Sequence, residues 1–153
     1  MSTGKNRQLS WVFYMNTVPD AAVLTESSSA TSAQTRELTA IIAQLNELLD
    51  EEESDDHGIL RANRASCKTA CELLKDADTI FAREHDRHIP FGCASTDSEG
   101  GIRIEWVRPS SGVHLVVPAT SEPGAYIYHE VGDVFGTEPA TDAALARWLR
   151  EIN

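Results

Sequence analysis

The strongest indication of the fold is the segment Ile102-Arg-Ile-Glu-Trp-Val107. It is followed by the turn Arg108-Pro-Ser-Ser-Gly112 and the run Val113-His-Leu-Val-Val117. Apolar and polar residues alternate in the first run, which is typical of a strand with one buried face. A connection this short joins antiparallel neighbours, because a parallel pair requires a crossover of about a dozen residues or more. We therefore expect a β-hairpin over this segment.

The hairpin extends into a meander on both sides. Strand-length segments lie at residues 91–96 and 125–131, and the intervening segments are rich in turn-forming residues. These segments together predict a four-stranded antiparallel meander. We expect residues 132–139, which include two glycines, to form a loop after the last strand.

Three other segments carry the helical period. In residues 34–50, apolar side chains recur at steps of three and four, and residues 60–85 and 141–153 follow the same pattern. The first two helices are joined by a short acidic segment, so we expect them to pack antiparallel. The predicted fold class is α+β, with an antiparallel helix pair, a four-stranded antiparallel meander and a C-terminal helix. The helices should cover one face of the sheet.

The chain has 153 residues, a length typical of one domain. We expect a flexible N-terminal arm over residues 1–32, which ends in a polar low-complexity stretch, and a single α+β domain over residues 33–153. The arm contains Trp11-Val-Phe-Tyr-Met15, which could add a strand to a sheet edge here or in a partner chain. This apolar run is too short for a membrane helix or a signal peptide, and three cysteines are an odd number. A cytoplasmic location is therefore expected.

Acidic residues outnumber basic ones by 24 to 13, which gives a formal charge of −11. Such a charge repels nucleic-acid phosphates and anionic lipids unless basic side chains cluster, and here they are spread thinly. The expected partner is another protein, by preference a basic one, with a homodimer as a second option and no direct contact with nucleic acid or a membrane. Adaptation to high salt is another reason for surplus acid.

The densest acidic run is residues 50–56. We expect it to form a solvated loop, because like charges repel and a helix C-terminus disfavours anions. An alternative is that the run imitates nucleic-acid phosphates, which would make the protein an acidic nucleic-acid mimic that inhibits a nucleic-acid-binding protein.

Soft metal ligands gather around the predicted second helix. The candidates are Cys67, Cys71, His85, His88 and Cys93. Their spacing is not that of a structural zinc site, and a cysteine pair on an apolar helical stripe usually packs in the core. We therefore predict no metal and no cofactor, and keep a small metal-dependent enzyme as an alternative function.

No nucleophile elbow, phosphate-binding loop or zinc-protease motif occurs in the sequence. Four residues near the last strand, His114, His129, Glu130 and Asp133, have side chains suited to acid–base chemistry. Alternation along the strands places His114 and His129 on opposite faces of the sheet, which argues against one shared site. The chain is therefore more simply explained as a protein without catalytic residues.

A four-residue loop after Val107 would put Ile102, Ile104 and Trp106 on the core face together with the apolar residues of the next strands. The opposite face would then carry Arg103, Glu105, His114, Val116, Tyr126 and Tyr128. Mixtures of Tyr, Arg and His are typical of protein interfaces. This face contacts a foreign partner, or else the N-terminal arm or a second copy covers it. A three-residue loop would exchange the two faces of the first strand pair.

The C-terminal part of the chain resembles a loose group of small uncharacterised prokaryotic proteins. The resemblance lies in Gly100-Gly-Ile-Arg-Ile-Glu-Trp106, the hairpin, Tyr126-Ile-Tyr128 and a closing helix with Trp148. These proteins pair two helices with a Gly-Gly-x-x-x-Glu-Trp meander. The resemblance implies an antitoxin-like or defence-associated role. With the charge and the mixed sheet face, it leads us to expect a non-catalytic protein-binding module, either antitoxin-like or an accessory subunit of a prokaryotic complex.

Overall fold

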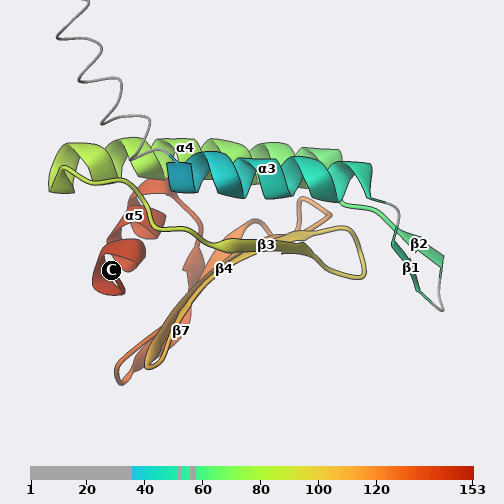
Figure 1. Cartoon of the computed structure of the whole chain (residues 1–153). Helices are drawn as coiled ribbons and strands as arrows, with labels where there is room; N and C mark the ends of the chain where they lie inside the picture. The colour runs from blue at the N-terminus through green and yellow to red at the C-terminus, as the bar shows by residue number, and fades with distance from the viewer. Residues whose placement is uncertain (1–35, 52, 56–57) are drawn as a thin grey trace, which may run out of the picture. The chain divides into compact units, whose positions relative to one another are not determined.

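The alternating segment forms the centre of an antiparallel sheet in the computed structural model, which describes residues 36–51, 53–55 and 58–153 (Figure 1). Each strand of the sheet pairs with the next strand along the chain. In order, they are β3 (Cys93–Thr96), β4 (Ile102–Arg108), β5 (Ser111–Val117), β6 (Tyr126–Val131) and β7 (Val134–Pro139). The α+β class is thus observed, while the predicted arm over residues 1–32, with its run from Trp11 to Met15, lies outside the described residues.

The sheet has five strands rather than four, because the expected loop over residues 132–139 is wrong. Val131 pairs with Val134, so the chain reverses through only two residues. One of them, Gly132, has a φ of 61°, a left-handed conformation that glycine adopts without strain. The second glycine, Gly136, pairs with His129, and a Cβ there would lie 3.6 Å from the imidazole. Gly132 therefore serves the turn, and Gly136 is accommodated in the strand, where an added Cβ would meet the imidazole at an ordinary contact distance.

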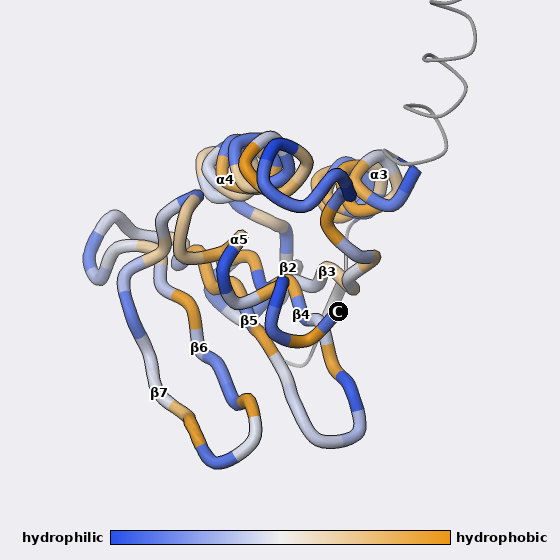
Figure 2. Tube along the Cα trace, turned by 90° about the vertical axis from the view of Figure 1, so that its left-hand side faces the viewer, coloured by the Kyte–Doolittle hydropathy of each residue, from blue (hydrophilic) through white to orange (hydrophobic). Residues whose placement is uncertain are grey.

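In the described part of the chain, three helices accompany this sheet: α3 (Arg36–Asp50), α4 (Arg64–His85) and α5 (Asp142–Glu151). The first two run antiparallel, and Figure 2 shows them side by side. The described helices include none with the length and apolarity needed to cross a bilayer.

The segment between α3 and α4 differs from expectation. Within the acidic run, β1 (Glu53–Asp55) pairs with β2 (Gly58–Leu60) as a small hairpin, where the sequence predicts a loop and then the start of the second helix. The second helix begins at Arg64 because Asn63 caps it, with the side-chain oxygen accepting the Ser66 N–H at 3.1 Å.

The core lies between the helices and one face of the sheet. Register pairs Trp106 with Val113, Ile104 with Leu115 and Ile102 with Val117. Arg108 still pairs with Ser111, so the turn has two residues rather than the predicted four. Two and four residues give the same alternation, and the predicted core face is therefore confirmed. The largest fully buried side chains are Trp106, Phe81, Ile41, Leu45, Leu74, Ile89, Ile102, Ile104, Leu115, Ile127, Leu145 and Leu149.

The Gly-Gly and Trp positions of the quoted motif hold elements together. Gly100 has a φ of 89°, and a Cβ there would lie 2.9 Å from the Arg61 carbonyl oxygen. Its own carbonyl accepts the Asn63 N–H at 2.8 Å, which fixes the start of α4. The Trp106 indole donates to the Pro90 carbonyl at 2.8 Å. These motif residues therefore have structural roles.

Candidate protein-docking face

The sheet surface that points away from the three helices is called the open face below. All six residues predicted for it lie there, in two neighbouring cross-strand rows: Arg103–Val116–Tyr126 and Glu105–His114–Tyr128. The helices that contact the sheet do so from the core side, and none in the described part of the chain packs on the open face (Figure 1).

The second row is held in a defined geometry. The His114 Nδ1 lies 3.1 Å from a Glu105 carboxylate oxygen, and the imidazole meets the Tyr128 ring edge-on, with the ring centroids 5.5 Å apart. Arg103 lies 3.9 Å from the same carboxylate oxygen. Because each side chain restrains the next, this part of the surface is ordered before any partner arrives, which reduces the entropy lost on binding.

Val116 differs from the other five predicted residues. It is only 7% exposed, although it points away from the core. Its cross-strand neighbours Arg103 and Tyr126 flank Val116 and cover most of its surface. A partner would therefore contact Arg103 and Tyr126 before Val116.

A third row on the open face adds exposed apolar side chains that the sequence analysis missed. Register aligns Val107, Gly112, Glu130 and Phe135 across four strands. Val107 is 62% exposed and Phe135 is 75% exposed. The sequence does not predict Phe135 as an open-face residue, because the pattern over residues 132–139 indicates a loop and not the strand β7. The Gly132-Asp133 pair between two valines is a hairpin signal that could have revealed it.

The five candidate metal ligands do not form a site. No group of three or more His, Cys, Asp and Glu side chains that could hold a metal occurs in residues 36–51, 53–55 and 58–153. Cys67 is buried and Cys93 is exposed. His85 packs edge-on against Phe81, and His88 lies 2.7 Å from the Asp78 carboxylate.

The cysteine pair on α4 is protected from reaction by its surroundings. Burial raises the pKa of both Cys67 and Cys71, and proximity to Cys71 raises that of Cys67 further. Thiols with raised pKa values stay protonated near neutral pH and are poor nucleophiles and metal ligands. Cys67 belongs to the buried core, and the half-buried Cys71 packs against it.

The alternation argument for the two histidines is confirmed. His129 lies on the core side of the sheet, where its ring stacks on Trp148 with a centroid separation of 3.6 Å, while His114 lies on the open face. The two imidazoles therefore cannot share one site. On the core side, the carboxylate of Glu138 accepts hydrogen bonds from Trp148 and Arg147.

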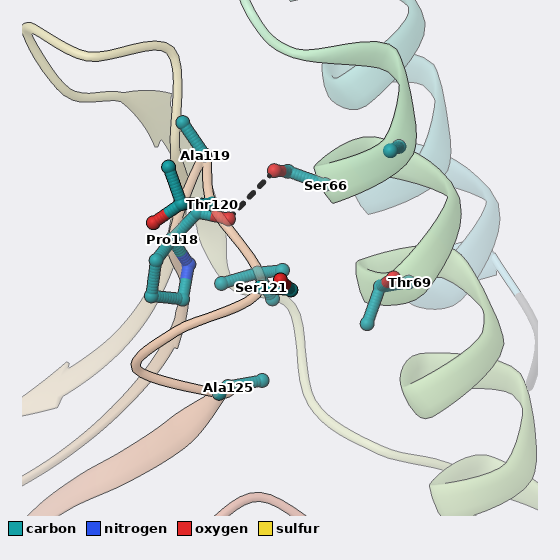
Figure 3. Close-up of a pocket in the computed structure, with 10 residues that line it drawn as sticks. Ser66, Thr69, Pro118, Ala119, Thr120, Ser121 and Ala125 are labelled. Atoms are coloured by element: carbon teal, nitrogen blue, oxygen red, sulfur yellow. Dashed lines mark hydrogen bonds between the residues drawn. The ribbon is translucent and has the colours of Figure 1, made fainter.

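A hollow of about 290 Å³ lies between the first turns of α4 and the loop after β5 (Figure 3). The Ser66 hydroxyl donates to the Pro118 carbonyl at 2.8 Å across one side of it. Small apolar and hydroxyl side chains line this hollow, and none of the lining residues is charged or titratable. It therefore offers no acid or base for catalysis.

No protein-family model, curated protein or solved structure matches this chain. The resemblance to the Gly-Gly-x-x-x-Glu-Trp group stays a prediction, and the function has to be inferred from the side chains of the open face.

Proposed function

We propose that the protein is a non-catalytic protein-binding module that docks on another protein through its open face, as an antitoxin-like neutraliser or as an accessory subunit of a prokaryotic complex. The observation that carries the proposal is the pair of neighbouring cross-strand rows with Tyr126, Tyr128 and His114 on the sheet face opposite the helices, of which the row with Tyr128 and His114 is held by side-chain contacts. Tyrosine, arginine and histidine in such an arrangement supply contact area and hydrogen bonds together.

The composition of the face favours a protein over other ligands. Val107 and Phe135 supply exposed apolar area beside the polar rows, which is the combination found at protein interfaces. The formal charge of −11 favours a basic partner, because long-range attraction speeds encounter when the charges are opposite.

The chemistry of the reactive side chains supports a role without catalysis. The thiols of Cys67 and Cys71 have raised pKa values, and the His88 Nδ1 lies 2.7 Å from the Asp78 carboxylate. Asp78 also accepts the Ile89 N–H at 2.9 Å, so this pair fastens the end of α4 to the chain that follows. This structural role accounts for the side chains of both Asp78 and His88.

The test is co-purification with the products of neighbouring genes, using the tagged full chain and two variants. Tyr128→Ala removes a central side chain of the open face, and Lys68→Ala is a matched control at an exposed position on α4. We expect Tyr128→Ala to reduce retention of the partner at least tenfold, while Lys68→Ala retains it as the wild type does. Equal retention by all three chains, or retention of no partner together with turnover of a substrate, would contradict the proposal.

A further inference from the structure

The two edges of the sheet are treated differently. At the β3 edge, the amide of Gln44 on α3 occupies the place of a neighbouring strand. Its Oε1 accepts the Ala94 N–H at 2.9 Å, and its Nε2 donates to the Gly92 carbonyl at 3.1 Å. One side chain thus satisfies an outward donor and an outward acceptor, and it blocks the addition of another strand.

The β7 edge has no such cover in the described chain, where β7 is the last strand of the sheet order. The Ala140 N–H donates to the Ala125 carbonyl at 2.9 Å. By the alternation of an antiparallel ladder, the backbone N–H and C=O groups of residues 134, 136 and 138 therefore point toward β6. The N–H and C=O groups of Phe135 and Thr137 therefore point outward, together with the carbonyl of Pro139.

The surroundings of this edge suit an apolar strand. Phe135 is 75% exposed on the open-face side, and Val134 is 58% exposed on the other side. A hollow of about 320 Å³ borders the strand where the β6–β7 hairpin meets α5. Its lining residues are Val131, Val134, Arg147, Trp148 and Glu151. Apolar side chains of an added strand would have a place to bury there.

The charge around the edge is negative. Glu130 is exposed beside Phe135, and Asp133 is exposed in the turn. The two nearby arginines are already engaged, since Arg147 binds Glu138 and Arg150 binds Glu151. Neither carboxylate has a cationic partner among the residues that the structure describes, so basic side chains on an incoming strand would meet unpaired charges.

We propose that the β7 edge is a strand-addition site for an extended segment of a partner protein in which apolar residues alternate with lysine or arginine. Backbone hydrogen bonds to Phe135 and Thr137 supply the pairing, and Glu130 with Asp133 selects the basic side chains. This inference rests on the proposed function and specifies how the partner engages beside the open face. A second copy is the weaker occupant, because β7 carries no basic residue and each copy has a charge of −11.

The probe is a capped peptide of four Val-Lys repeats, with four Val-Glu repeats as the control peptide. Binding to the full-length, isotope-labelled protein is followed by amide chemical shifts. We expect saturable shifts centred on Phe135 and Thr137 with the lysine peptide and at least tenfold weaker binding of the glutamate peptide. The amides of β3 should not move, because Gln44 covers that edge.

Two variants at one position separate backbone from side-chain effects. Thr137→Pro deletes an outward N–H, which an edge strand tolerates, whereas Thr137→Val keeps it. We expect Thr137→Pro to weaken the lysine peptide at least tenfold and Thr137→Val to bind as the wild type does. Should Thr137→Pro fail to fold, Phe135→Lys places a positive charge on the same edge and should weaken the lysine peptide similarly.

Several outcomes would overturn the inference. These are an absence of shifts at Phe135 and Thr137, equal binding of both peptides, or full binding by Thr137→Pro. Shifts of these amides that grow with protein concentration alone would assign the edge to a second copy instead. If a purified partner is lost with Tyr128→Ala but kept by folded Thr137→Pro, the docking function stands and the strand-addition site is wrong.

Discussion

Glu138 joins β7 to α5 at the scale of a single side chain. Its carboxylate accepts hydrogen bonds from the Trp148 indole and from Arg147. The hydrogen bond from Trp148, followed by that from Arg147, holds the pKa of Glu138 below its usual range. The charged form is therefore favoured by folding.

A carboxylate whose pKa is lowered on folding stabilises the protein above its unfolded pKa, and this contribution is lost as the pH falls through the folded value. Replacing Glu138 by Gln should therefore reduce the free energy of unfolding near neutral pH and have progressively less effect as the pH falls through the lowered pKa of the folded state. Urea unfolding of both chains from neutral to acid pH measures this. Parallel pH profiles for the two chains would show that Glu138 does not contribute in this way.

Some residue positions could be predicted from the sequence, and others could not. Parity along β4 and β5 placed Arg103, Glu105 and His114 on the open face, because strand alternation and the length of one turn determine the side. The role of Gln44 could not be predicted, because its partners Gly92 and Ala94 lie about 50 positions away and meet it only after the helix has packed.

At the scale of elements, the helices and strands β3 to β6 follow from periodicity, while β7 does not. Its sequence Val134-Phe-Gly-Thr-Glu-Pro139 includes a glycine and a proline, which normally weaken a strand. Both fit here, because Gly136 lies beside the His129 ring and Pro139 is the last residue of an edge strand. Such tolerance depends on neighbours that the local sequence does not specify.

The side chain of Gln44 covers the β3 edge, and a single substitution at this position should expose that edge. Gln44→Ala leaves the Ala94 N–H and the Gly92 carbonyl without these partners, and we expect it to reduce the free energy of unfolding by about 1–2 kcal/mol. It should also promote self-association through the newly opened edge. Urea unfolding and light scattering test both effects.

Asn46→Ala is the matched control for Gln44→Ala, because Asn46 is exposed on the same helix. It should not reduce stability, since alanine has the higher helix propensity. Gln44→Ala with the stability and solubility of this control would show that the side chain does not close the edge.

At the scale of the described molecule, the helices and the open face lie on opposite sides of one sheet. The apolar face of the meander is buried under α3, α4 and α5, whereas the aromatic and charged rows face outward. The sequence predicted this division correctly. It did not predict the apolar third row or the open β7 edge, because both depend on the fifth strand.

A partner that docks on the open face should protect its side chains from hydroxyl radicals, and footprinting of the purified complex measures this protection. Tyr126 and Tyr128 should be oxidised several-fold more slowly in the complex than in the free protein, while Leu73, a half-buried residue on α4, should be oxidised at the same rate in both. Slower oxidation of Leu73 with unchanged rates at both tyrosines would contradict the account, because the partner would then lie on the helices.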